Sequence, residues 1–144
     1  EHRRHLAQAR QSLLALADVV ILPLTGAEAV TGSPRVKAGT ATKLVLNAIT
    51  TGAMIRIGKT FGNLMIDLRA MSAKLVDRGE RIVMEVTGVE RADARRLIDE
   101  AGGSVRTAIF MQQRGFSRAD AERELHDAGG VLRRVLPNAP PPVA

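Results

Sequence analysis

The spacing of apolar residues predicts a short helix, a short strand and a loop in the first part of the chain. Residues Arg4–Ala17 carry leucines at moderate helical spacing. Val19–Leu22 is a β-branched run before a proline, which predicts a buried strand. Thr25–Gly39 has no such pattern and is expected to form a loop.

A longer apolar pattern begins at Thr40 and predicts a buried helix that stops at Gly58. Its apolar positions are Leu44, Val45, Ile49, Met54, Ile55 and Ile57. Apolar and polar residues then alternate over Asn63–Arg69, which is typical of a short extended segment. The chain is therefore expected to be predominantly helical.

The second half of the chain predicts a helix followed by a compact helical subdomain. Ser72 is a candidate N-cap for a helix that runs to Val86 and is closed by Gly88. Three short amphipathic segments, each ended by glycine, follow at 92–103, 104–115 and 117–130, with Ser104 and Ser117 as candidate N-caps. The proline-rich residues 137–144 are expected to be disordered.

Composition narrows the class of protein. The 45% hydrophobic content is enough for a packed core, but only three residues are aromatic, which argues against a base-stacking surface for nucleic acid. Cysteine is absent, so disulfides and thiolate zinc sites are excluded. The net charge of +6 is dispersed along the chain, which favours a solvated surface and does not by itself identify a partner. No apolar run is long enough for a bilayer span, because charged or polar residues interrupt each one.

The loop before the long helix has the chemistry of an anion site. Gly32 and Gly39 permit unusual backbone angles, and a following helix start offers free amides and partial positive charge. Hydroxyls and cations stand beside it: Ser33, Thr40, Arg35 and Lys37. The alternative, at even weight, is that Thr40 only caps the helix and the cations are solvated. The spacing does not match a nucleotide-binding P-loop.

Glu28 is the only carboxylate in the loop, and beside several cations it should be ionised. Pairing with Arg35 is the favoured role for it, and orienting a sugar hydroxyl is the alternative. His2 and His5 have helical spacing but no further ligands, and His126 has no companion, so no metal site is expected.

Residues 25–68, TGAEAVTGSPRVKAGTATKLVLNAITTGAMIRIGKTFGNLMIDL, strongly resemble the signature region of N-acetylmuramic acid 6-phosphate etherases. The resemblance extends over roughly residues 18–136. Animal glucokinase regulatory proteins share part of it. Two positions differ from the family's usual motif: Ala27 stands where the motif has proline, and Pro34 stands where it has threonine.

The resemblance implies a sugar isomerase (SIS)-type α/β fold, a parallel sheet flanked by helices. Residues 1–87 would be the C-terminal part of that sugar-phosphate domain and 88–136 a helical C-terminal subdomain. It also implies a cytoplasmic homodimer in murein recycling that needs no metal or organic cofactor. The implied reaction cleaves the D-lactyl ether of N-acetylmuramic acid 6-phosphate and gives N-acetylglucosamine 6-phosphate and D-lactate.

Site residues are implied only where positions match. The family's two catalytic glutamates lie upstream of the signature, and nothing in Glu1–Ala17 matches them, so no catalytic residue is assigned to this chain. Glu28, Ser33, Arg35 and Lys37 occupy matching positions and would line the sugar-phosphate site. Asn47, Gly62, Asn63 and Asp67 also match, and are expected to form turns or pack.

Three hypotheses follow. The first is a fragment of an etherase that is inactive alone, because it lacks the acid and base. The second is a non-catalytic sugar-phosphate-binding or regulatory module. The third is a basic DNA-binding helix-turn-helix over residues 104–126, which is disfavoured because its arginines do not form one face and acids are mixed among them. No nucleic-acid or membrane partner is therefore expected.

Overall fold

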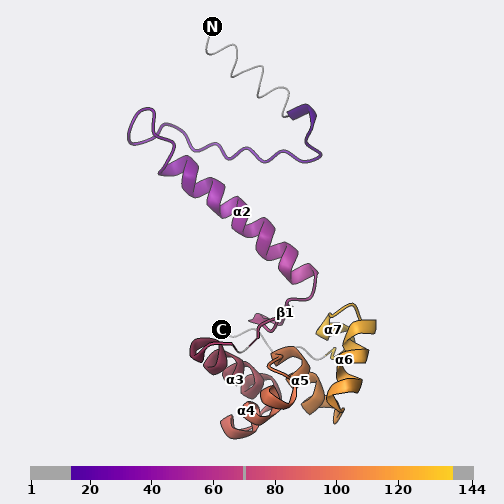
Figure 1. Cartoon of the computed structure of the whole chain (residues 1–144). Helices are drawn as coiled ribbons and strands as arrows, with labels where there is room; N and C mark the ends of the chain where they lie inside the picture. The colour runs from indigo at the N-terminus through magenta and orange to yellow at the C-terminus, as the bar shows by residue number, and fades with distance from the viewer. Residues whose placement is uncertain (1–13, 70, 138–144) are drawn as a thin grey trace. The chain divides into compact units, whose positions relative to one another are not determined.

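A computed structural model describes residues 14–69 and 71–137. The chain divides into two compact units, Glu1–Ala48 and Ile49–Ala144. The elements in chain order are α2 (Lys37–Arg56), β1 (Thr60–Phe61), β2 (Leu64–Met65), α3 (Ala73–Thr87), α4 (Arg91–Glu100), α5 (Val105–Arg114), α6 (Arg118–Asp127) and α7 (Leu132–Val135) (Figure 1). The helix expected over Arg4–Ala17 lies mostly outside the described residues, as does the proline-rich tail after Pro137.

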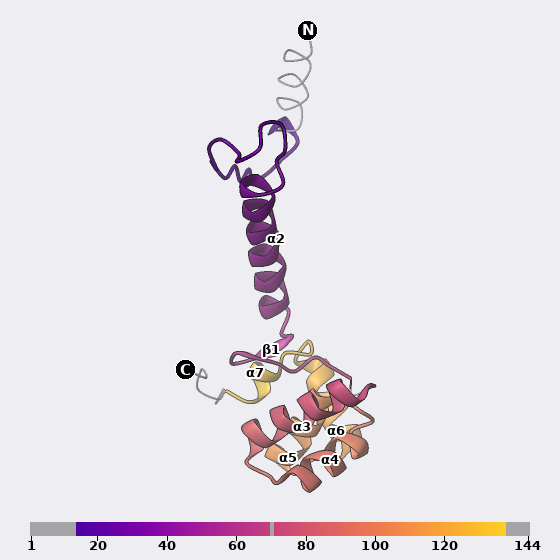
Figure 2. The same ribbon diagram turned by 90° about the vertical axis from the view of Figure 1, so that its left-hand side faces the viewer.

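The second unit is built around one hydrophobic core. α3 packs against α4 and α5, α4 packs against α5, and α5 packs against α6, an arrangement that two perpendicular views show (Figures 1 and 2). The largest fully buried side chains come from β1, from the segment after β2, and from helices α3, α4, α5 and α7: Phe61, Ile66, Val83, Ile98, Val105, Ile109, Phe110 and Leu132. The helices that follow α3 therefore share one core with it.

A short hairpin precedes these helices and contributes to the same core. β1 and β2 pair antiparallel around a two-residue turn, with Phe61 opposite Leu64, and Gly62 supplies the positive φ of that turn. Ile66 and Leu68 are buried while Met65 is exposed, which confirms the alternation predicted for the extended segment.

The hairpin is closed by contacts between Lys59 and Asp67. The carbonyl of Lys59 accepts hydrogen bonds from the amides of Ile66 (3.2 Å) and Asp67 (3.3 Å), and its ammonium group pairs with the Asp67 carboxylate. Asp67 therefore has the packing role that was expected from its place in the signature region.

Serine caps and glycine stops set the helix ends in the second unit, as predicted. The hydroxyls of Ser72, Ser104 and Ser117 accept hydrogen bonds from amides three residues later. α3 and α5 end at Gly88 (φ +75°) and Gly115 (φ +67°), whose left-handed backbone terminates a helix without a Cβ clash.

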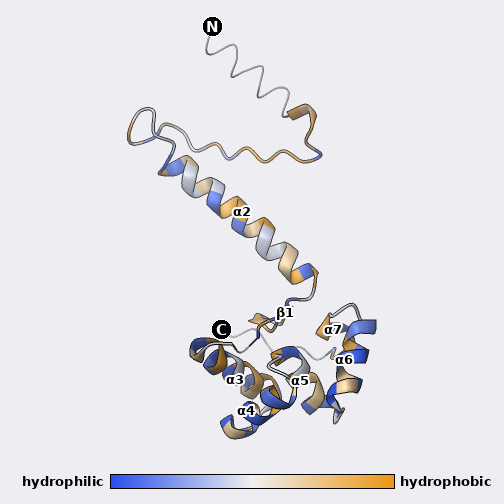
Figure 3. Ribbon diagram, in the orientation of Figure 1, coloured by the Kyte–Doolittle hydropathy of each residue, from blue (hydrophilic) through white to orange (hydrophobic). Residues whose placement is uncertain are grey.

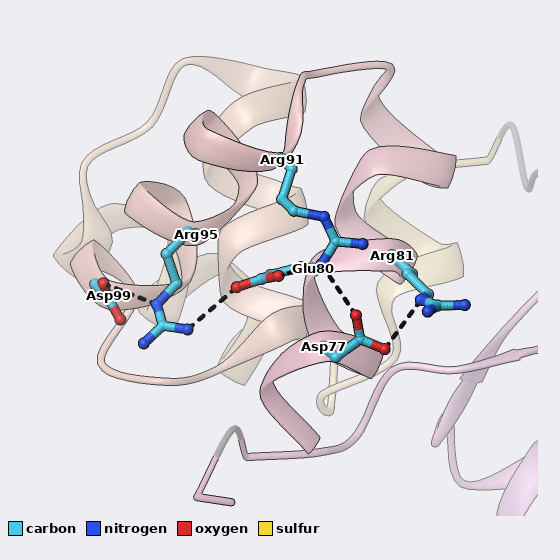
Figure 4. Close-up of polar contacts among 6 residues, drawn as sticks. All are labelled: Asp77, Glu80, Arg81, Arg91, Arg95 and Asp99. Carbon is cyan, nitrogen blue, oxygen red and sulfur yellow. Dashed lines mark hydrogen bonds and ion pairs between the residues drawn. The ribbon is translucent and has the colours of Figure 1, made fainter. Parts of the chain in front are cut away.

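An ion-pair network joins α3 to α4 (Figure 4). The Glu80 carboxylate, only 9% exposed, accepts from Arg91 (2.6 Å) and from Arg95 (3.1 Å). Asp77 pairs with Arg91 and with Arg81, and Arg95 also contacts Asp99. A buried carboxylate is stable here because both of its oxygens have cationic donors.

The part of the chain before β1 differs from the prediction in two ways. Residues 19–22 form no strand, and all four side chains are exposed, because no described segment pairs with their backbone. α2 begins at Lys37 rather than Thr40, and none of its residues is buried, although apolar residues recur along its length (Figure 3). The prediction that this helix is buried is therefore wrong for the chain as described. Its end was correctly predicted, because the turn after Arg56 closes at Gly58 with a φ of +79°.

The described residues are mostly helical, as expected, and their one sheet is the two-stranded antiparallel hairpin.

Candidate functional site

The predicted anion-binding loop folds back so that its own carboxylate caps α2. Glu28 accepts hydrogen bonds at Oε2 from the Lys37 amide (3.0 Å) and at Oε1 from the Ala38 amide (2.9 Å). These are two of the amides that a helix start leaves without an intrahelical partner. The anion that occupies this helix start in the structure is therefore part of the chain itself.

The capping contacts act on the ionisation of Glu28. The hydrogen bond from the Ala38 amide, and then the one from Lys37, lower the pKa of the Glu28 carboxyl below its usual value. The carboxylate is therefore ionised at neutral pH, and both oxygens are engaged. This is a suitable state for a structural cap and an unsuitable one for a group that must donate a proton.

The other predicted site residues lie close by along the chain. The Lys37 ammonium group donates a hydrogen bond to the Ala27 carbonyl (2.8 Å), which gives a second link between the start of the loop and the start of α2. The Ser33 amide donates to the Val30 carbonyl (3.1 Å) in a turn, and the Ser33 side chain is half-buried. Arg35 is exposed, and no ion pair to it occurs in residues 14–69 and 71–137.

Two expectations for this loop are wrong. Glu28 does not pair with Arg35, because its oxygens bind the Lys37 and Ala38 amides instead. Thr40 does not cap α2, because the helix already starts at Lys37 and the Thr40 amide is bonded to the Val36 carbonyl (3.1 Å). The structure therefore brings Glu28 and Lys37 together and leaves Arg35 apart.

Metal chemistry finds no support in the part of the chain that is described. No group of three or more His, Asp or Glu side chains there is arranged to hold a metal ion. His2 and His5 lie outside the described residues. Within residues 14–69 and 71–137, no helix has the length and apolar character needed to cross a membrane.

The arginines of the proposed helix-turn-helix have partners within the second unit. Arg118 pairs with Glu122 (2.7 Å) and Arg123 with Asp120 (2.7 Å). Arg106 and Arg114 donate to the carbonyls of Gly130 (2.9 Å) and Val135 (2.8 Å). The four arginines therefore do not present the single basic face of unpaired side chains that would follow a nucleic-acid backbone.

Sequence reasoning missed the role of Arg106, which lines a polar cavity described below. A signal was present, since the chain repeats EAGGSVR at 100–106 as DAGGVLR at 127–133. The glycine pairs of both repeats adopt positive φ, and the Gly130 carbonyl accepts the hydrogen bond from Arg106.

Comparison with known proteins gives consistent similarities to one kind of enzyme. The chain is 57% identical over 95 residues to N-acetylmuramic acid 6-phosphate etherase 2 of Vibrio parahaemolyticus, which covers 66% of this chain and 32% of the relative. It is 58% identical over 96 residues to the etherase of Klebsiella aerogenes, and 51% identical over 96 residues to that of Clostridium botulinum, covering 67% of this chain and 32% of each relative. No family model matches the chain.

Identity at this level over about two thirds of the chain relates it to bacterial proteins that are named as etherases. The chain belongs to the N-acetylmuramic acid 6-phosphate etherase family, as the signature residues predicted. It spans about a third of the length of the curated relatives that it matches.

Proposed function

We propose that this chain is part of an N-acetylmuramic acid 6-phosphate etherase. The reaction would release D-lactate from N-acetylmuramic acid 6-phosphate and leave N-acetylglucosamine 6-phosphate. The observation that carries this proposal is the 51–58% identity to relatives of that name.

The chemistry proposed for the whole enzyme needs two carboxyl groups. In the open-chain sugar, the aldehyde acidifies the proton at C2, a carboxylate base removes it, and an acid protonates the ether oxygen at C3 as lactate leaves. Water then adds at C3 while C2 regains a proton, so the net change is the addition of one water molecule. Such a step works best when one carboxyl has a raised pKa and the other a low one.

Two acids of this chain, Glu28 and Glu80, do not fit those two roles. Glu28 has a lowered pKa and uses both oxygens as a helix cap, while Glu80 is held by two arginines in the helical unit. We therefore infer that the acid and the base come from outside this chain, and that the chain alone has no lyase activity.

The loop is proposed to contact the phosphate end of the substrate. Arg35 and the Ser33 hydroxyl would bind the phosphate, and Lys37 would add positive charge beside them. Glu28 would act as a positioning residue, because its carboxylate fixes the loop against the start of α2.

The exposed apolar residues of the first part of the chain support a larger α/β domain of the sugar isomerase type. Leu44, Leu46, Ile49, Met54 and Ile55 are each about half exposed along α2, and Val19 and Leu24 are largely exposed. Apolar side chains on several sides of a helix are typical of a helix buried within a larger protein. We propose that the remainder of such a domain covers α2, and that the whole enzyme is a cytoplasmic homodimer.

A non-catalytic sugar-phosphate-binding module is the second candidate, and the engagement of Glu28 and Glu80 in structural contacts favours it for the chain alone. Incubation of residues 1–144 with N-acetylmuramic acid 6-phosphate, with D-lactate measured enzymatically and binding measured by calorimetry, tests both proposals. We expect binding without D-lactate release. Turnover by the chain alone would contradict the assignment of the acid and base to other residues.

The binding part of this test has a matched pair of variants. Arg35→Gln removes an exposed cation of the loop, and Lys43→Gln removes an exposed cation of α2. Loss of a charge-assisted hydrogen bond predicts about tenfold weaker binding for the first variant, and the second should bind as the unmodified chain does. Equal affinities for both variants would contradict the role of the loop.

A further inference from the structure

A polar cavity of about 360 Å³ lies within the second unit, where the segment after β2 meets the first turn of α5 and the first half of α6. Its charged and hydroxyl lining includes Asp67, Arg69, Ser104, Arg106, Arg118 and Glu122. It shares no residue with the loop of residues 25–39. Three guanidinium groups and two carboxylates therefore line one cavity that is partly open to solvent.

Arg106 has an unused donor in this region. Its Nη1 donates to the Gly130 carbonyl (2.9 Å) and lies 3.6 Å from Oδ1 of Asp67. Its Nε is the one buried side-chain polar atom without a hydrogen-bond partner in the described part of the chain. A buried guanidinium N–H is destabilising unless it meets an acceptor, so this atom indicates an acceptor that the chain does not supply.

The nearby acids are engaged with other cations. Asp67 pairs through Oδ2 with Lys59, and Glu122 accepts from Nε of Arg118 (2.7 Å). Arg69 makes no side-chain ion pair within residues 14–69 and 71–137, although its backbone bridges to Ser104. Donors and positive charge therefore exceed the acceptors that remain available around the cavity.

We propose that this cavity binds an oxyanion of the phosphate class, held by Arg106 together with Arg69 and Arg118. A phosphate group offers several strong acceptors to guanidinium donors, and it would balance the excess positive charge that a neutral ligand would leave. The Ser104 and Thr107 hydroxyls, which lie 2.8 Å apart on the cavity wall, provide further polar contacts. This inference does not depend on the proposed etherase activity.

Titration of the ¹⁵N-labelled chain, residues 1–144, with sodium phosphate tests the proposal. The Arg106 Nε–H resonance should shift saturably with phosphate, beyond its response to sodium chloride at the same ionic strength. Arg69→Gln should weaken the apparent binding about tenfold, because it removes one charge-assisted contact. Arg133→Gln removes an equal charge from an exposed position outside the cavity and should change binding less than twofold.

Three results would overturn the proposal. A response to phosphate no larger than the response to chloride would show that the cavity holds only solvent. Equal effects of the Arg69 and Arg133 variants would show general charge screening. An equally strong saturable response to sodium acetate would assign the site to carboxylates instead of phosphates.

Discussion

At the residue scale, the Glu28 carboxylate determines how the loop meets α2. Its two oxygens bind the Lys37 and Ala38 amides, nine and ten residues further along the chain. A helix start that would otherwise attract an external anion is thus already neutralised. The cations that remain for a ligand are those on the side chains of the loop.

Replacement of Glu28 should release the start of α2. In Glu28→Ala, hydrogen exchange at the Lys37 and Ala38 amides should accelerate, because both amides lose their acceptor. Asp18→Ala, which removes another exposed acid of the first unit, should leave these rates unchanged. Amide exchange followed by NMR makes the comparison, and unchanged protection in Glu28→Ala would show that the cap is not stabilising.

The cap of α6 predicts a dependence on pH. The Ser117 hydroxyl, and then Arg123, lower the pKa of Asp120 below its usual value. A carboxyl whose pKa is lower in the folded state contributes stability at pH values above its unfolded pKa of about 3.9, and this is lost as the pH falls through the folded value.

Asp120→Asn should therefore show a smaller loss of stability between pH 6 and pH 3 than the unmodified chain. Asp127→Asn, at the exposed end of the same helix, is the control and should follow the unmodified chain. Urea unfolding at both pH values measures this difference. An identical acid response in the Asp120 variant would contradict the proposed contribution of the cap.

The capping serines and terminal glycines could be predicted because each one affects backbone only a few residues away. The Ser117 hydroxyl, for example, accepts a hydrogen bond from the Asp120 amide. The Glu28 cap could not be predicted, since it depends on how the loop folds back to bring together two residues nine positions apart. The cavity around Arg106 could not be predicted either, because the segment after β2, α5 and α6 form it only once they have packed together.

At the scale of elements, the charged contact between α3 and α4 should contribute measurably to stability. Glu80→Gln keeps the shape of the side chain but removes the charge that Arg91 and Arg95 bind. The expected loss in the free energy of unfolding is about 1–3 kcal/mol, because the carboxylate is nearly buried and doubly hydrogen-bonded. Glu85→Gln, on an exposed position of α3, should change it by less than about 0.5 kcal/mol. Denaturant unfolding that finds equal effects would show that the network is not stabilising.

Two helical glycines should respond oppositely to alanine. A Cβ on Gly79 would lie 2.9 Å from Cγ2 of Val105, so Gly79→Ala should force α3 away from α5 and cost about 1–3 kcal/mol. Gly52 in α2 has nothing within 4 Å of that position, so Gly52→Ala should favour the helix by up to about 1 kcal/mol. Thermal unfolding and helical circular dichroism measure the two effects, and a neutral Gly79→Ala would contradict the close packing of α3 on α5.

The element scale also shows where sequence patterns succeed and fail. The alternation around Ile66 and the helical periods of α3–α6 were predictable because their apolar faces are buried within this chain. The strand at residues 19–22 and the burial of α2 were not confirmed, since both patterns require neighbouring segments that do not lie beside them here. Apolar periodicity predicts that a surface should be buried, and it does not identify the partner that buries it.

At the scale of the whole molecule, our two proposals place a ligand site in each of the two units. The first unit carries the loop with Ser33, Arg35 and Lys37, for which we propose phosphate binding. The second unit has its own core and the cavity around Arg106. Because the chain spans about a third of its relatives, the proposed acid and base can belong to other residues of the whole enzyme.

One NMR titration of the ¹⁵N-labelled chain with N-acetylmuramic acid 6-phosphate tests this account most directly. The same sample reports the amides of the loop and the methyl signal of any lactate that is released. We predict saturable shifts at the amides of Ser33, Arg35 and Lys37, with no free lactate. Accumulation of lactate, or loop amides that do not move at saturating sugar phosphate, would contradict the account.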